Sequence, residues 1–255
     1  MTVPFPPADV HFSDLKRIGR SPAHYRSGIE HPGKATPAML FGTLVHAIVL
    51  GGRFVVYPGA RRGNAWKEYA EEHAGDCIVT QAEYDRAEPC AQAVLDHPVA
   101  APLLEGARLE AFLRWDLGGR KCAGTLDILN PDRHYLADVK TSTCSEPGWF
   151  MWQARKMSYH AQLDWYRAGA EKNGHIIRDC YAIVVETKRP WPVTVMRLTD
   201  FALELGGRQT RLWLERLDGC VEVGEWPAYV QDVVDLDIEG PADLIGFDDE
   251  DDDDA

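Results

Sequence analysis

The sequence predicts an α/β fold in which helices pack on a central mixed sheet, and two observations along its 255 residues lead to this expectation. The first third has helical periodicity, whereas the middle has the two-residue period of strands. The later strands and helices lack the regular strand–helix alternation of a parallel sheet, so a sandwich of helices on a mixed sheet is expected. The composition, with 45% hydrophobic and 26% charged residues, is typical of a globular protein.

Residues 1–105 are expected to be a mainly helical N-terminal elaboration that forms one integrated domain with the rest. Thr36 and Pro37 provide an N-cap and a first-turn proline for one helix. Thr80 and Glu83 form a capping box for another. The expected elements are a helix over 13–19 capped by Ser13, an irregular or helical element over 21–26, helices over 36–52 and 80–97, a strand over 54–58, and a basic loop over 59–69.

Residues 106–240 are expected to form the core of the fold. The first three strands follow one another through short GGR and NPDR turns, so they should pair in antiparallel fashion. One long helix comes next, and one stripe of it is mostly apolar and should face the core, namely Met151, Ala154, Ser158, Ala161, Trp165 and Ala168. The expected elements are strands over 108–117, 121–129, 134–142, 178–187 and 191–198, and helices over 147–172 and 200–217.

The charge is unevenly distributed along the chain. The formal net charge is -13, and seven acids lie within residues 248–254, so the remainder carries only -6. We expect residues 241–255 to be a disordered, solubilising tail, with an interaction tail that competes with DNA as the alternative. Six scattered cysteines indicate reduced thiols and argue against an iron–sulfur cluster. No signal peptide or membrane span is predicted, so a cytoplasmic location is expected.

Two acids and a lysine stand in the strand-like stretch GTLDILNPDRHYLADVKTS. Side chains two residues apart share a face of a strand, so Asp138 and Lys140 should project together while Val139 enters the core. The tight turn makes the two strands neighbours, and Asp127 can therefore converge with Asp138. Paired carboxylates favour a bridging cation, and their hard oxygens select Mg²⁺ or Mn²⁺. An exposed strand with a surface ion pair is the alternative.

This spacing resembles the PD-(D/E)XK nuclease superfamily, with Leu126 in place of the proline of the motif. The helix GTLVHAIVLG resembles the RecB-type branch, in which the histidine, here His46, joins the metal site; a packed core histidine is the alternative. Glu110 could add a metal ligand, or it could be an edge-strand surface acid. The resemblance implies a restriction-endonuclease-like fold, with Asp127, Asp138 and the Val139 carbonyl on the metal.

The stretch after the lysine also resembles the RecB-type nucleases. Its Y-x-x-Q-x-x-x-Y pattern places Tyr159, Gln162 and Tyr166 on one helical stripe with Arg155. In those nucleases the glutamine and tyrosine hold the DNA strand. The resemblance further implies that Lys140 positions the attacking water. We therefore expect catalytic roles for Gln162 and Tyr166, and DNA contacts from Arg155 and Tyr159.

The basic loop offers a second candidate DNA contact. Arg61, Arg62 and Lys67 could bind phosphates beside Trp66, whose ring could stack on a base at a duplex end. A solvated connector with an inward-packing tryptophan is an equal alternative.

Over residues 11–220 the chain resembles the nuclease domain of exonuclease VIII and its prophage-encoded relatives. This resemblance implies Mg²⁺-dependent 5′→3′ digestion of linear double-stranded DNA, a single-strand annealing recombinase as partner, and a ring-shaped homotetramer in a phage-bearing bacterial host. The same chemistry on single-stranded DNA, or as an endonuclease, is one alternative. A non-catalytic DNA-binding or scaffold protein that retains the fold is another.

Overall fold

The computed structural model describes residues 5–230 and 232–235 and contains a five-stranded mixed sheet between helices. The strands are β3 (Arg108–Leu117), β4 (Arg120–Asn130), β5 (Tyr135–Ser142), β6 (Asp179–Glu186) and β7 (Val193–Arg197), in that spatial order. β5 and β6 run parallel, and the other neighbours are antiparallel. The predicted α/β class and the mixed sheet are therefore confirmed.

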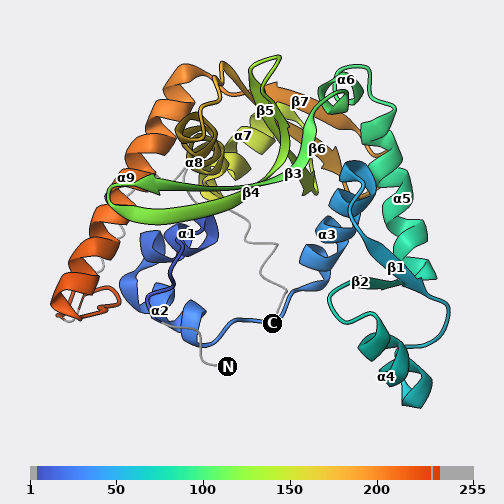
Figure 1. Cartoon of the computed structure of the whole chain (residues 1–255), viewed down its shortest axis with the longest axis horizontal. Coiled ribbons are helices and arrows are strands. Elements are labelled where there is room, and N and C mark those ends of the chain that lie inside the picture. Colours follow the sequence, from blue (N-terminus) through green and yellow to red (C-terminus); the bar gives the residue numbers. More distant parts are fainter. Residues whose placement is uncertain (1–4, 231, 236–255) are drawn as a thin grey trace.

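Helices cover both faces of this sheet (Figure 1). A separate pair of parallel strands, β1 (Phe54–Tyr57) and β2 (Cys77–Thr80), lies at one end of the molecule. The helix that connects the two strands along the chain, over residues 63–72, lies beside them (Figure 1). The helices are α1 (Phe12–Arg20), α2 (Pro22–Glu30), α3 (Pro37–Leu50), α4 (Gly63–Glu72), α5 (Gln81–Leu95), α6 (Ala101–Leu104), α7 (Pro147–Lys156), α8 (Tyr159–Lys172) and α9 (Asp200–Val223).

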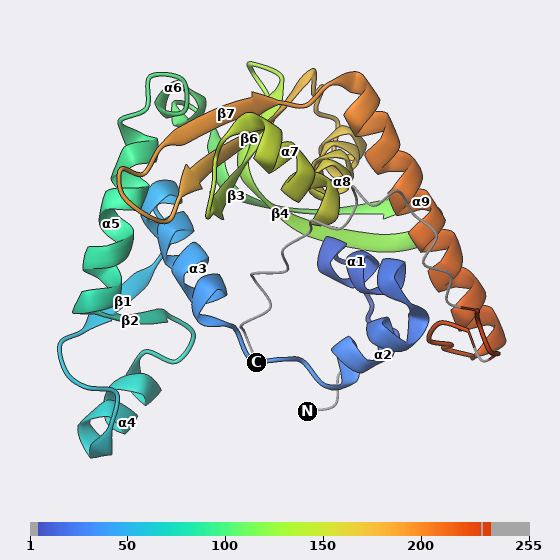
Figure 2. The same cartoon turned by 180° about the vertical axis from the view of Figure 1, so that it is seen from behind.

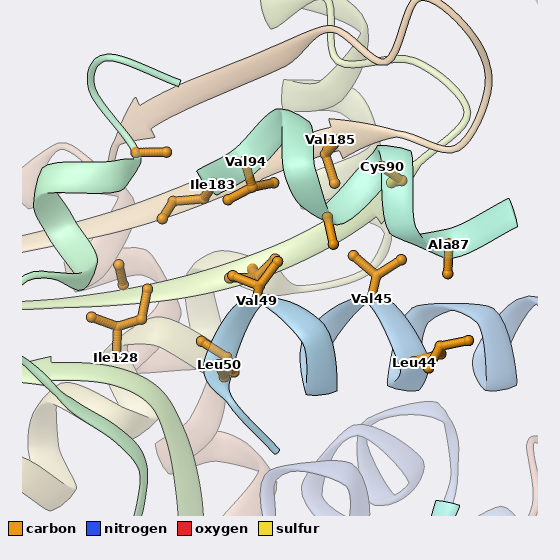
Figure 3. Close-up of a cluster of buried hydrophobic side chains, with 14 of the residues drawn as sticks. Leu44, Val45, Val49, Leu50, Ala87, Cys90, Val94, Ile128, Ile183 and Val185 are labelled. Carbon is orange, nitrogen blue, oxygen red and sulfur yellow. The ribbon is translucent and has the colours of Figure 1, made fainter. Parts of the chain in front are cut away.

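One face of the sheet is covered by α3 and α5. Figure 3 shows side chains of α3, including Val45 and Val49, pointing toward Cys90 and Val94 of α5 and toward Ile183 of β6. These side chains are buried, so their removal from water fixes α3 against the sheet. Placement of α3 matters because the helix also carries His46.

The opposite face is covered by α7, α8 and the N-terminal half of α9, which Figure 2 shows from behind. Leu136 and Val184 of the sheet pack here with Phe150, Leu163 and Leu203 of the three helices. A third cluster joins α1 and α2 to α8, α9 and the β3–β4 hairpin. This cluster brings α1, from the start of the chain, beside the β3–β4 hairpin at one edge of the sheet.

The helix ends follow the chemistry of their caps. The Thr36 hydroxyl accepts a hydrogen bond from the Met39 N–H at 3.2 Å, and α3 ends at Gly51 with φ +69°. Thr80 and Glu83 form the predicted capping box of α5. The segment over 21–26 is helical, and Ser21 caps it. The predicted cap of the first helix, Ser13, is wrong: the helix begins at Phe12, and its N-cap is His11, two residues earlier.

The basic segment over 59–69 is only partly a loop. Helix α4 begins at Gly63, so Trp66 and Lys67 lie on a helix rather than on a connector. Strand β2 was not predicted; it forms by pairing in parallel with β1, a contact between segments about twenty residues apart.

The predicted helix over 147–172 is broken. Ser158 adopts a left-handed conformation with φ +58°, and it separates α7 from α8. Ser158 is buried, and its hydroxyl accepts a hydrogen bond from Gln209 of α9 at 3.3 Å, which supports the bend. The stripe predicted to face the core does not run through this break. Ala161 is fully buried as expected, but Met151 is 63% exposed.

Among the residues that the structure describes, no helix is long and apolar enough to cross a membrane. The expected acidic tail, 241–255, lies outside the described residues.

Candidate functional site

The pairing of strands β4 and β5 ends next to Asp127 and Asp138. Their ladder pairs Asn130 with Tyr135, Leu129 with Leu136, and Ile128 with Ala137, and it stops there. The next positions in this register are Asp127 and Asp138. Both acids therefore stand where the hairpin opens, while Asp138 still pairs with Ala182 of β6 on its other side.

The Asp127 carboxylate fills part of this opening. Its Oδ2 accepts a hydrogen bond from the Val139 N–H at 2.8 Å and lies 3.4 Å from His46 Nδ1. Burial and the nearby charge of Asp138 together raise the pKa of Asp127 to about 8, against the opposing effect of Lys140. Two acids held close together in a partly dry site disfavour ionisation until a cation neutralises them.

Asp138 and Lys140 form the second half of the site. The Asp138 side chain is 4% exposed, and its Oδ2 lies 2.5 Å from Lys140 Nζ. This contact has ion-pair distance but not hydrogen-bond geometry, so Oδ2 has no hydrogen-bond partner among the described residues. The charges of Asp138 and Asp127 raise the pKa of Lys140 despite its burial, which keeps the amine protonated. The amine also lies 4.8 Å from the centroid of the Tyr159 ring.

His46 lies over the opening from α3. Burial lowers the pKa of its imidazole, so the ring is neutral near neutral pH and has a lone pair available for a cation. The close packing of α3 on β5 is visible at Gly42, where an added Cβ would lie 3.2 Å from the Thr141 hydroxyl oxygen. The predicted grouping of His46 with Asp127 is therefore present.

Glu110 on β3 stands opposite Asp127 in the register but is not paired with it. The ladder joins Leu109 to Ile128 and Ala111 to Leu126 and omits the position between them. Glu110 has φ +49°, a conformation that costs a non-glycine residue roughly 1–3 kcal/mol and that is often found at functional sites. Its charge acts on both Asp127 and His46.

The helix stripe after Lys140 is present only in part. On α8 the Gln162 side-chain amide donates to the Tyr166 hydroxyl at 3.1 Å, and the Tyr166 ring covers Gly124 of β4. Arg155 lies on α7, before the break at Ser158, and is exposed. The structure thus brings Gln162 and Tyr166 together beside β4, while Arg155 belongs to a different helix.

The basic segment over 59–69 lies apart from Asp127 and Asp138. Arg61 is bound to Glu83 at 2.7 Å, donates to the Ile78 carbonyl at 2.6 Å, and lies over the Trp66 ring. Arg62 and Lys67 are exposed. Arg61 and Trp66 line a cavity of about 600 Å³ together with residues of α3, α5 and β2. Their predicted contact with DNA stays a prediction.

The donor set fits a hard divalent cation. Two carboxylates, a neutral imidazole and the Val139 backbone are ligands that Mg²⁺ or Mn²⁺ accepts. The buried Asp138 Oδ2 is ion-paired with Lys140 and accepts no hydrogen bond from the described residues, so this carboxylate can turn to a cation. Across the described ranges, however, no three His, Cys, Asp or Glu side chains already converge at metal-binding distances. Because Lys140 holds Asp138 here, metal binding requires this carboxylate to shift from the amine.

One basic residue beside this site had no signal in the sequence. Burial and the charge of Lys140 lower the pKa of Lys16 on α1, although 124 positions separate the two lysines in the sequence. A lysine flanked by core residues on an amphipathic helix looks like any surface lysine. Only the packing of α1 against α8 and β4 brings it near Lys140.

A mixed sheet between helices, with two acids and a lysine at an opened hairpin, defines a PD-(D/E)XK-type core. The chain belongs to the family described as a PDDEXK-like domain of unknown function (DUF3799), whose model matches residues 11–234. No curated protein matches the chain.

Two solved structures are similar to this chain at low sequence identity. A crystal structure described as a "putative exonuclease" from Eubacterium rectale is 14% identical, covers 86% of this chain and 82% of its own, and superposes with a TM-score of 0.63. A phage-related exonuclease from Haemophilus somnus is 13% identical over 85% of this chain and 96% of its own, with a TM-score of 0.39. The first of these supports the restriction-endonuclease-like fold.

Proposed function

We propose that this protein is a divalent-metal-dependent deoxyribonuclease that digests linear double-stranded DNA from an end. The observation that carries the proposal is the opened β4–β5 hairpin, where Asp127, Asp138 and Lys140 gather beneath His46. Membership of the PDDEXK-like family supports phosphodiester hydrolysis as the chemistry of such a site.

The residues of the site have distinct roles in this proposal. Asp127, Asp138, His46 and the Val139 carbonyl hold the cation, with Glu110 as a further ligand or as the acceptor for a bound water. When bound, the cation supplies Lewis acidity that offsets the charge of the phosphate. Lys140 remains protonated and donates to the attacking water and to the phosphate oxygens.

The neighbouring aromatic and polar groups bind the strand. Gln162 and Tyr166 are coupled by their hydrogen bond, so they can present one rigid polar surface to the strand that is cut. Tyr159 holds the Lys140 amine over its ring face when Asp138 turns to the cation. Arg155, Arg61, Arg62, Lys67 and Trp66 are proposed to contact DNA further from the cut.

The finer features of the proposal rest on the resemblance to exonuclease VIII. They are Mg²⁺ as the physiological cation with Mn²⁺ as substitute, 5′→3′ polarity that leaves 3′ single-stranded tails, and an annealing recombinase that takes up those tails. A ring-shaped homotetramer in the cytoplasm of a bacterial host, encoded by a phage or prophage, completes the proposal. The putative exonuclease from Eubacterium rectale, whose fold this chain shares, agrees with an end-directed activity.

Substrate topology tests the proposal directly. Linear duplex labelled at either the 5′ or the 3′ end, and closed circular plasmid, are incubated with the protein in Mg²⁺ or EDTA. We expect Mg²⁺-dependent loss of the linear duplex with early release of the 5′ label, and an intact plasmid. Nicking of the plasmid would indicate an endonuclease. Digestion of single-stranded DNA alone would show that the substrate is single-stranded rather than double-stranded DNA, and binding without cleavage would indicate a non-catalytic protein.

A further inference from the structure

An apolar groove of about 470 Å³ opens between α7, α8, β7 and the start of α9. Its lining includes the buried side chains of Phe150 and Leu163. Three further apolar side chains of the lining remain in contact with water: Met151 is 63% exposed, Phe201 is 74% exposed and Leu205 is 45% exposed. Large apolar side chains that gather around one groove mark an interaction surface, whereas single exposed ones do not.

The charged groups at this groove are basic. Arg155 and Arg197 line it, and none of its lining residues is acidic, although the chain has a net charge of -13. Arg197 is bound to Asp179 at 3.0 Å, whereas Arg155 is exposed and has no ion-pair partner among the described residues. Lys156 follows Arg155 on α7, and its amine lies over the ring of the exposed Trp152. The groove is therefore suited to a segment that combines apolar residues with acids.

One segment of this chain has that combination. Leu244, Ile245 and Phe247 come directly before the seven acids of residues 248–254. A tail that only keeps a protein in solution gains nothing from three large apolar side chains, and blocks of like charge often serve as interaction tails. The acids have the charge opposite to that of Arg155, so both halves of the segment match the groove.

The described part of the chain leads toward this groove. The Tyr229 hydroxyl accepts a hydrogen bond from Arg20, at the end of α1, at 3.3 Å. Lys16 of the same helix lies 3.8 Å from the sulfur of Met157, whose neighbours in the sequence line the groove. The nine residues of α1 span about 14 Å, whereas the fifteen residues from Tyr229 to Leu244 reach up to about 50 Å. The segment can therefore reach the groove of its own chain.

We propose that residues 241–255 dock in this groove of the same chain. The three apolar residues of the segment pack among the apolar side chains of α7 and α9, and its acids lie beside Arg155. Docking has one consequence that rests on the proposed function, which assigns Arg155 to DNA. Because the acids and the phosphates of DNA require the same arginine, the segment and duplex DNA compete for α7.

Photo-crosslinking of the 255-residue chain tests the docking. The crosslinking residue p-benzoylphenylalanine takes the place of Phe247, and mass spectrometry identifies the residues that it reaches. The same chain is prepared with Leu205→Asp, which puts a negative charge into the groove, and with Leu212→Asp as the matched control. Leu212 lies on the same helix and is 64% exposed, but it does not line the groove. Thermal unfolding confirms that each variant is folded.

We expect crosslinks within one chain to residues 147–163 or 196–205. Their yield should fall about 10-fold with Leu205→Asp and stay unchanged with Leu212→Asp. Crosslinks only to other parts of the molecule would overturn the docking, and crosslinks that join two chains would show that a second copy supplies the segment. Hydrogen exchange gives a second readout: the α7 amides should exchange faster in Phe247→Ser than in the wild type, and equal exchange would overturn the docking.

Added duplex DNA separates this inference from the proposed function. In EDTA, saturating duplex should lower the yield of the groove crosslinks. An unchanged yield on a chain that binds duplex would support the docking and contradict the DNA contact of Arg155. Groove crosslinks in a chain that neither binds nor digests DNA would support the docking and refute the proposed function alone.

Discussion

Gly206 and Gly207 of α9 pack against α8. Substitution of Gly206 tests how the polar face of α8 is positioned. An added Cβ at Gly206 would lie 2.6 Å from the His160 carbonyl oxygen and 2.8 Å from the Ala161 Cα. Both are backbone atoms, so the clash cannot be relieved by rotation of a side chain. Gln162 follows these residues, and a shift of α8 would displace it together with Tyr166.

The expected magnitude follows from two opposing effects. Replacing glycine by alanine inside a helix stabilises it by about 1 kcal/mol. Forcing extra atoms into a packed interface costs about 1–3 kcal/mol, and a clash with backbone belongs at the upper end of this range. We therefore expect Gly206→Ala to lower the free energy of unfolding by about 2 kcal/mol. On the same helix, Gly219 has no atom within 4 Å of an added Cβ, so Gly219→Ala should gain about 1 kcal/mol.

Urea denaturation of the wild type and the two alanine variants in EDTA measures this difference, and digestion of linear duplex measures its effect on the site. We expect the midpoint of Gly206→Ala to fall, that of Gly219→Ala to rise, and only the first variant to lose activity. If Gly206→Ala is as stable as Gly219→Ala, then α8 and α9 do not approach as closely as described.

Three further predictions concern the site itself. The raised pKa of Asp127, about 8 in the fold against about 3.9 in an unfolded chain, means that folding favours the protonated acid. The free energy of unfolding in EDTA should therefore fall as the pH rises from about 4 to about 8, and Asp127→Asn should flatten this slope; parallel pH profiles would contradict it. Tyr159→Phe should retain digestion because the ring remains, whereas Tyr159→Leu should lower kcat about 10-fold, and equal rates in both would exclude a role for the ring. Gly124→Ala, whose Cβ would lie 2.8 Å from Tyr166 Cε1, should displace that ring and lower kcat, with unchanged kinetics as the opposing result.

Patterns that depend on local chemistry could be predicted from the sequence. Thr36 and Gly51 fix the ends of α3, and the turns between β3, β4 and β5 fix an antiparallel order, because caps and tight turns act within a few residues. The convergence of Asp127 and Asp138 followed from this order.

Features that depend on tertiary contacts could not be predicted. Ser158 breaks the helix because its left-handed conformation is supported by the hydrogen bond from Gln209, 51 residues away. Glu110 adopts a positive φ, which cannot be predicted for a glutamate from its residue type. Lys16 reaches the site only because Leu15 and Ile18 bury α1 against α8 and α9. In each case a distant packing partner decides the local geometry.

The most direct test of the central claim, that the opened β4–β5 hairpin cleaves DNA with a divalent cation, is the digestion rate of Lys140→Met on linear duplex in Mg²⁺. Methionine keeps the length of the side chain but cannot donate to water or phosphate. We predict a folded variant that still binds duplex but digests it about 100-fold more slowly than the wild type, which itself is inactive in EDTA. A wild-type rate in Lys140→Met would contradict the assignment of this hairpin as the active site.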